Sequence, residues 1–227
     1  GIHTQYILTS ESEETGQAFI TVDEAGQNTI LVYGGANMTL SATDVEMSAD
    51  AFIGADFVVA QLEVPFEAIE QAFKIARKQN ITTVLNPAPA IELPKSLLEL
   101  TDIIIPNETE AELLTGISIN NESDMKETAT YFLDLGISAV LITLGEQGTY
   151  CAYQEQYKMI PACNVKAIDT TAAGDTFIGA FLSELNKDLS NIESAIRLAN
   201  QASSLTVQRK GAQASIPTRK EVEAEYN

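Results

Sequence analysis

The sequence predicts an α/β fold, in which a mostly parallel sheet is covered by helices on both faces to give three layers. From about residue 55 onward, short apolar runs of strand length alternate with segments of helical periodicity. The strand candidates are almost continuously apolar, which is typical of strands buried on both faces. The polar residues that end these strands are Glu63, Asn86, Asn107 and Thr143. Because ligands of such sheets bind beyond the carboxyl ends of the strands, this edge is the predicted ligand side.

The elements are expected in the following order. Residues 17–23 and 29–33 predict two strands of a hairpin, joined by a glycine-containing turn over 24–28. The strands of the alternating region are expected at 57–62, 82–85, 102–105 and 139–143, with a second hairpin at 150–153 and 157–160. Helices are expected at 66–79, 93–100, 108–114, 124–135, 174–186 and 191–208. No internal repeat or clear linker interrupts the pattern, so residues 1–227 are predicted to form a single domain.

Composition excludes several classes of function. The formal net charge is -19, from 13 basic and 32 acidic residues, which disfavours nucleic acid or an anionic membrane as a partner. His3 is the only histidine and lies near the start of the chain, which argues against catalysis by a Ser-His-Asp or Cys-His arrangement. Cys151 and Cys163 are too few for a disulfide framework or a zinc site. With no signal-like leader and no long apolar run, a cytoplasmic location is expected.

The most informative stretch is Asp169-Thr170-Thr171-Ala172-Ala173-Gly174-Asp175-Thr176-Phe177. It begins a predicted helix, whose first N–H groups lack partners and attract anions together with the helix dipole. Gly174 lets the backbone approach a ligand closely. Asp175 lies in the first turn, where a carboxylate beside a bound phosphate is a suitable base for an attacking hydroxyl. The alternative interpretation is an ordinary helix start with an acidic residue in its first turn.

Three further motifs each allow two interpretations. Residues 106–110 either form a capping box through Asn107 and Glu110, or place both beside bound phosphate with Glu110 holding Mg²⁺ through water. Residues 143–148 form either an ordinary link between strands or a glycine-rich turn that a nucleotide approaches. Residues 209–212 either end a helix or supply freed carbonyls to a cation. The sequence has neither a P-loop nor the dinucleotide fingerprint.

Taken together, these motifs resemble the ribokinase-like carbohydrate kinase family over essentially the whole chain. The order and spacing of the stretches carry the resemblance: Tyr33-Gly34-Gly35-Ala36-Asn37, Gln61-Leu62-Glu63, Asn86-Pro87-Ala88-Pro89-Ala90, Pro106-Asn107-Glu108-Thr109-Glu110-Ala111-Glu112, Thr143-Leu144-Gly145, Asp169 to Phe177 and Arg209-Lys210-Gly211-Ala212. The resemblance implies ATP-dependent phosphorylation of D-ribose on its 5-hydroxyl to give ribose 5-phosphate. The alternatives are a related sugar or nucleoside kinase, and a truncated fragment that binds nucleotide or sugar without catalysis.

The resemblance also implies roles for individual residues. Asp175 matches the catalytic base, and the N–H groups of Ala172, Ala173 and Gly174 match an anion hole. Glu63 matches a sugar-binding acid, with Ala18 and Ile20 as apolar contacts from a lid at about residues 10–36. The nucleotide and magnesium region is matched by Asn107, Glu110, Thr143, Gly145, Glu146, Gln147, Gly148, Gly174 and Asn200. An activating potassium ion is expected on Asp169, Thr171, Thr206, Arg209, Gly211 and Ser215, largely through backbone oxygens.

The chain departs from the family pattern at its start. Family members begin with an additional segment, roughly a quarter of their length, that carries an early sugar-binding Asp and a Gly-Gly-Lys-Gly-Ala-Asn motif. Gly34-Gly35-Ala36-Asn37 is not that motif, because it follows the hairpin and lacks the Lys. The chain is therefore expected to be N-terminally incomplete, with the catalytic and nucleotide half but only part of the sugar site. The exposed apolar side of the lid predicts a homodimer formed through it.

Overall fold

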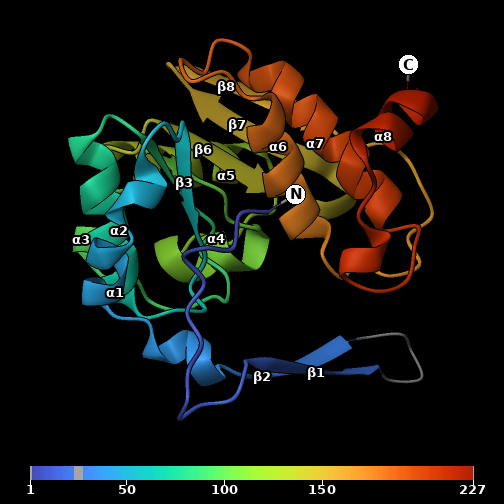
Figure 1. Ribbon diagram of the computed structural model, residues 1–227. Helices are drawn as coiled ribbons and strands as arrows, with labels where there is room; N and C mark the ends of the chain where they lie inside the picture. The colour runs from blue at the N-terminus through green and yellow to red at the C-terminus, as the bar shows by residue number, and fades with distance from the viewer. Residues whose placement is uncertain (1, 23–27, 227) are drawn as a thin grey trace. The chain divides into compact units, whose positions relative to one another are not determined.

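The computed structural model describes residues 2–22 and 28–226 (Figure 1). The chain divides into two compact units, each described by itself: the first comprises Gly1–Pro89 and Leu93–Thr101, and the second comprises Ala90–Glu92 and Asp102–Asn227. The predicted single domain, with a lid at about residues 10–36, stays a prediction.

The first unit begins with the predicted hairpin, which is confirmed. Strands β1 (Gln17–Val22) and β2 (Asn28–Tyr33) pair antiparallel, and the predicted turn falls almost entirely on residues 23–27, outside the described residues. The elements that follow are η1 (Gly35–Thr39), α1 (Ala42–Met47), η2 (Ala49–Phe52), β3 (Phe57–Ala60), α2 (Phe66–Lys78), β4 (Thr82–Leu85) and α3 (Lys95–Leu98). Strand β3 pairs parallel to β4, as expected for the alternating pattern.

The core of the first unit lies between α2 and these strands. Ile69 and Phe73 of α2 pack with Leu85 of β4 and with Leu97 of α3. The prediction of a fully buried strand at 57–62 was wrong, because β3 ends at Ala60 and Val59 is exposed. Burial of a strand depends on what pairs and packs beside it, which an apolar run alone does not specify.

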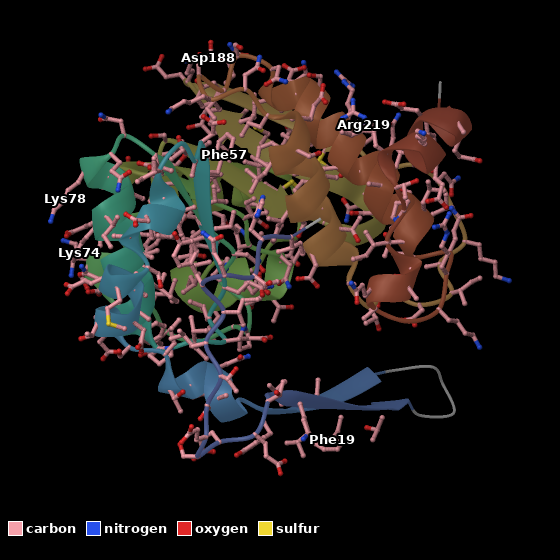
Figure 2. The ribbon with its side chains drawn as sticks, viewed as in Figure 1. Phe19, Phe57, Lys74, Lys78, Asp188 and Arg219 are labelled. Atoms are coloured by element: carbon pink, nitrogen blue, oxygen red, sulfur yellow. The ribbon has the colours of Figure 1, made fainter. Side chains whose placement is uncertain are left out.

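The β1–β2 ribbon carries apolar side chains on both faces. Phe19 lies opposite Leu31 on one face, and Ala18 lies opposite Val32 on the other. Phe19 is 55% exposed, Leu31 70% and Val32 53%, and Figure 2 shows the Phe19 side chain projecting from the ribbon. A two-stranded ribbon without a covered face is at best marginally stable by itself. The ribbon therefore has two apolar surfaces available for a ligand or partner.

The second unit contains the remaining elements. They are β5 (Ile103–Ile104), α4 (Glu108–Thr115), α5 (Glu122–Asp134), β6 (Ala139–Thr143), η3 (Gly145–Gln147), β7 (Gly148–Tyr153), β8 (Gln156–Pro161), α6 (Ala173–Glu184), α7 (Ile192–Thr206), η4 (Gln213–Ser215) and α8 (Arg219–Tyr226). Strand β5 is parallel to β6, whereas β6, β7 and β8 are joined antiparallel in that order. The predicted second hairpin is thus confirmed as two antiparallel strands.

Helices cover both faces of β7 and β8. Thr149 of β7 bonds to Asn200 of α7, and Lys158 of β8 bonds to Glu193 of the same helix. On the opposite face, Tyr157 lies beneath the ammonium group of Lys126 from α5. Because neighbouring residues of a strand point to opposite faces, α5 and α7 lie on different sides of these strands. The predicted layering of helix, sheet and helix is therefore present within this unit.

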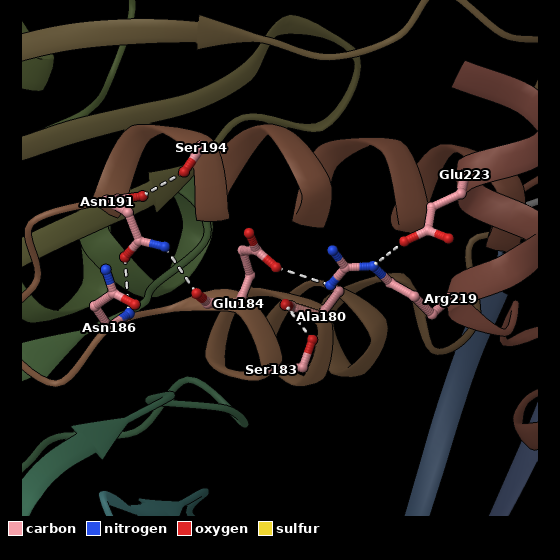
Figure 3. Close-up of polar contacts among 8 residues, drawn as sticks. All are labelled: Ala180, Ser183, Glu184, Asn186, Asn191, Ser194, Arg219 and Glu223. Carbon is pink, nitrogen blue, oxygen red and sulfur yellow. Dashed lines mark hydrogen bonds and ion pairs between the residues drawn. The ribbon is translucent and has the colours of Figure 1, made fainter. Parts of the chain in front are cut away.

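Helix α8 was not predicted, and ion pairs connect it to α6. Arg219 donates to Glu184 near the end of α6 and to Glu223 within α8, at 2.8 Å in each case (Figure 3). Helices α6 and α7 pack side by side in Figure 1, with their bounds within two residues of the expected ones. None of the helices formed by the described residues is both long and apolar enough to cross a membrane.

Candidate active site

The stretch from Asp169 to Phe177 forms the start of α6. Ala172 is the N-cap residue and has a left-handed backbone conformation, with φ 61° and ψ 13°. This conformation costs about 1 kcal/mol for a residue with a side chain, and such strain concentrates at functional sites. The strained turn directs the backbone into the first turn of α6, so it shapes the predicted anion hole.

The three predicted donors of that anion hole are not equivalent. The N–H of Ala173 donates to the carbonyl of Thr170 at 3.2 Å. Among the described residues, no hydrogen-bond partner is found for the N–H groups of Ala172 and Gly174. A Cβ at Gly174 would meet no atom within 4 Å, so packing inside the chain does not require glycine there. These two N–H groups and the open space above Gly174 suit an anionic ligand.

Asp175 occupies the first turn of the same helix. Its side chain is exposed, two positions after the N1 residue Ala173. The following residue, Thr176, is buried, and Phe177 stacks on Phe181 one turn later. The packed side of α6 thus fixes the helix, while Asp175 remains on the accessible side. This placement is the one that a general base at a ligand site requires.

Asp169 joins the loop before α6 to the loop after α7. Its carboxylate accepts the N–H of Thr171 on Oδ1 and the N–H of Gly211 on Oδ2, at 3.0 Å each. The carbonyl of Val207 accepts the N–H groups of Ile168 and Asp169. Hydrogen bonds from the backbone of Gly211 and from Thr171 lower the pKa of Asp169 to about 2, so this carboxylate stays charged at neutral pH.

The other predicted potassium ligands lie on the second of these loops or at the end of α7. Thr206 is buried and donates to Thr176 at 3.0 Å, while Ser215 is buried and donates to the carbonyl of Ala212 at 2.6 Å. Arg209 pairs with Glu221 of α8. The described residues contain no cluster of three or more His, Cys, Asp or Glu side chains that could hold a metal ion. The structure thus brings the segments 169–171 and 206–215 together.

Asn107 and Glu110 form the predicted capping box at the start of α4. The Asn107 side chain accepts the N–H of Glu110, and Glu110 accepts both the N–H and the amide of Asn107, all at 2.8 Å. Only 6% of Glu110 is exposed, and burial raises the pKa of its carboxyl. Asn107 also forms a parallel bridge with Thr143, which places the two strand ends side by side. The capping interpretation is confirmed, and the magnesium role stays a prediction.

The predicted nucleotide loop combines a structural glycine with an exposed turn. Gly148 has φ +111°, and a Cβ there would collide with the carbonyl oxygen of Ile160 and with the N of Ala162. Gly145 has φ +53°, and it begins the exposed turn that continues through Glu146 and Gln147. The interpretation of residues 143–148 as an ordinary link between strands therefore explains the glycine at position 148. The exposed residues 145–147 remain available for a ligand.

Asn200 has a structural role that the sequence did not reveal. Its side chain is 6% exposed, accepts a hydrogen bond from Thr149 at 2.9 Å, and donates to the carbonyls of Ile160 and Pro161. These bonds join α7 to the β7–β8 hairpin. Its predicted place beside the nucleotide stays a prediction, and the side-chain amide is already bonded within the unit.

The predicted sugar-binding residues belong to the first unit. Glu63 is exposed and lies just after β3, where the N–H of Leu62 donates to the carbonyl of Ala88. Beside it, Gln61 donates to the Asn86 side chain at 3.2 Å. Ala18 is exposed on β1. The side chain of Ile20 lies outside the described part of the chain.

Comparison with known proteins decides the family. The model of the pfkB family of carbohydrate kinases matches residues 1–219. The chain belongs to the pfkB family of carbohydrate kinases. The resemblance found in its motifs and the predicted α/β fold are therefore confirmed.

Individual members of the pfkB family are similar along nearly the whole chain. A ribokinase of Staphylococcus aureus is 63% identical over 97% of this chain and 73% of its own length. A bifunctional ribokinase/ribose-5-phosphate isomerase A of Fructilactobacillus sanfranciscensis is 52% identical over 98% of this chain, which spans only 41% of that protein. The structure of Arabidopsis thaliana ribokinase complexed with ribose and ATP superposes with a TM-score of 0.83 at 33% identity, covering 94% of this chain and 69% of that one.

Proposed function

We propose that this pfkB-family kinase transfers the γ-phosphate of ATP to the 5-hydroxyl of D-ribose. The observation that carries the proposal is the start of α6, where the N–H groups of Ala172 and Gly174 find no partner within the described part of the chain and the exposed Asp175 follows them. Positioning and charge stabilisation account for most of the catalysis of phosphoryl transfer, and a base completes the requirement. The choice of ribose is supported by the 63% identity to the Staphylococcus ribokinase.

Each residue at this helix start has a defined task in the proposed reaction. Asp175 accepts the proton of the attacking sugar hydroxyl as the new O–P bond forms and the bond to ADP breaks. The N–H groups of Ala172 and Gly174 donate to the oxygens on which negative charge develops. Glu63 binds sugar hydroxyls, and Ala18 and Ile20 of β1 cover the sugar. Covering the sugar excludes water and so suppresses hydrolysis of ATP.

Two cations complete the proposal. Glu110 would hold Mg²⁺ through water, and Asn107 would lie beside the phosphates. The exposed turn of Gly145, Glu146 and Gln147 would lie beside the nucleotide, flanked by Thr143, Gly148 and Asn200. The proposed K⁺ ion would be held by oxygens of Asp169, Thr171, Thr206, Arg209, Gly211 and Ser215. A carboxylate that stays charged and two loops joined through Asp169 fit a cation site built from oxygens. A bound cation adds fixed positive charge there, which keeps the loop before α6 in place.

Other features support the proposed assembly and location. The apolar, exposed faces of the β1–β2 ribbon favour a homodimer in which ribbons pack against each other. The acidic net charge of -19 disfavours nucleic acid or an anionic membrane surface as a partner. Cys151 and Cys163 are both free thiols, which agrees with a reducing cytoplasmic location.

The proposed substrate is tested by steady-state kinetics of the full-length protein. ADP formation is measured with ATP and ribose, and in parallel with 2-deoxyribose, fructose and a nucleoside. We expect kcat/KM for ribose to exceed that for each alternative by about 10-fold or more. A site built to bond the ribose hydroxyls leaves its polar groups unpaired with 2-deoxyribose, and a site shaped for a pentose does not match fructose or a nucleoside. A higher kcat/KM for a nucleoside would identify a nucleoside kinase. Binding of ATP and sugar without turnover would identify a non-catalytic module.

The proposed cation site is tested by replacing K⁺ with tetramethylammonium, which is too large for a cage of loop oxygens. We expect kcat to fall by about 10-fold or more, because the anion hole loses part of its preorganisation. The second measurement is the melting temperature, which K⁺ should raise in the wild-type protein by binding only its folded state. Asp169→Asn should abolish that rise, whereas the exposed control Asp188→Asn should retain it. Equal activity and melting temperature in both salts would refute the site.

A further inference from the structure

The first turn of α6 is held from the neighbouring helix α7. The Oγ of Ser203 donates to the backbone carbonyl of Ala173 at 2.9 Å. One turn along α7, the Oγ1 of Thr206 donates to the Oγ1 of Thr176 at 3.0 Å. These two contacts flank Gly174 and Asp175 in sequence, so α7 holds a backbone carbonyl on one side of the proposed catalytic residues and a side-chain hydroxyl on the other.

The bond from Ser203 acts on one particular peptide group. The carbonyl of Ala173 and the N–H of Gly174 belong to the same planar unit, in which C=O and N–H point in opposite directions. A hydrogen bond that fixes the carbonyl therefore fixes the direction of the N–H. The same bond polarises the peptide group and makes its N–H a stronger donor. Among the described residues the Gly174 N–H has no partner of its own, so its direction depends on the carbonyl side.

Ser203 is itself anchored to the loop that carries Asp169. The backbone carbonyl of Ser203 accepts the N–H of Val207 at 3.0 Å, and the carbonyl of Val207 accepts the N–H groups of Ile168 and Asp169 at 2.7 and 3.1 Å. A continuous set of hydrogen bonds thus runs from the Asp169 loop through α7 to the peptide between Ala173 and Gly174. The serine hydroxyl is its last link.

We propose that Ser203 is a positioning residue for phosphoryl transfer, which aims the Gly174 N–H at the phosphoryl group in transit. This proposal rests on the proposed function, because it assigns the Gly174 N–H to the anion hole. It predicts that the Ser203 hydroxyl matters more in the transition state than for binding ATP, because charge on the transferred oxygens grows as the reaction proceeds.

The test compares three variants of the full-length protein in ribose-dependent ADP formation. Ser203→Ala should lower kcat by about 10-fold or more while KM for ATP changes by less than about twofold, since the hydroxyl acts chiefly in the transition state. Ser203→Thr keeps the hydroxyl and should restore most of the lost kcat. Ser183→Ala is the matched control, because Ser183 also donates to a carbonyl of α6, that of Ala180, but away from the first turn (Figure 3). It should behave as wild type.

A second measurement separates positioning from general stability. Aluminium fluoride bound with ADP mimics the phosphoryl group in transfer. The protein's affinity for ADP with aluminium fluoride, divided by its affinity for ADP alone, therefore reports on the anion hole. Ser203→Ala should reduce this ratio by about the factor lost from kcat. An unchanged ratio, or a kcat equal to that of Ser183→Ala, would overturn the proposal even if the melting temperature falls. Absence of turnover in the wild-type protein would instead refute the proposed function, and this inference with it.

Discussion

Replacing Asp175 by Asn is expected to lower kcat for ribose phosphorylation by about 10²–10⁴-fold, the usual contribution of a general base. The amide has nearly the same shape but cannot accept the proton of the attacking hydroxyl. Asp175 is exposed in the first turn of α6, so the change should leave the packed side of the helix and the melting temperature nearly unaltered. Affinity for ATP should stay within about threefold, because the base acts on the sugar hydroxyl.

Initial rates and equilibrium binding of ATP provide the measurement for Asp175→Asn. The matched control is Asp188→Asn, which removes an exposed carboxylate from the loop after α6, where it accepts the N–H of Ser190. That variant should keep wild-type kcat. If Asp175→Asn turns over at a rate near that of the control, the assignment of Asp175 as base is refuted and another proton acceptor must be sought.

Gly148→Ala is expected to destabilise the protein by about 3 kcal/mol or more, the largest stability effect of the substitutions proposed for this chain. The residue has φ +111°, a conformation that an L side chain rarely adopts, and the added methyl would collide with the backbone at Ile160 and Ala162. Strand β7 would have to move away from β8 at its first pair, Gly148 with Pro161. Denaturant unfolding of both proteins measures the loss directly.

Gly179→Ala is expected to change the free energy of unfolding in the opposite direction, although it is also a glycine-to-alanine substitution. Gly179 is exposed within α6, where a Cβ would meet no atom within 4 Å. Alanine restricts the unfolded chain and favours helix, so this variant should be more stable by about 0.5–1 kcal/mol. A similar stability for both variants would show that backbone strain at Gly148 has been overestimated.

Much of the fold follows from local patterns. The strands at 82–85 and 139–143 were predicted with their observed bounds, because each is a dense apolar run ended by a polar residue or a turn. Helix α1 was missed although Ser41 and Asp44 form a capping box, since its few residues show no clear apolar period. The exposure of Val59 in β3 was also missed, because burial of a strand is decided by its neighbours in space.

In the candidate site, too, some features could be predicted from the sequence and others could not. The motif from Asp169 to Phe177 predicted the start of α6 and the place of Asp175 in its first turn, because capping and dipole effects are local. The left-handed conformation of Ala172 has no sequence signal, since alanine does not favour it and only surrounding contacts impose it. The contact of Ser203 with the carbonyl of Ala173 could not be predicted either, because a single serine in a helix forms no sequence pattern.

The β1–β2 ribbon makes affinity and local folding inseparable. If a sugar or a second chain packs on its apolar faces as proposed, it binds only the paired form of the two strands. The apparent dissociation constant then equals the intrinsic one divided by the fraction of ribbons that are paired. Substitutions at cross-strand pairs such as Phe19 and Leu31 change that fraction, and they therefore tune binding even at positions the ligand never touches.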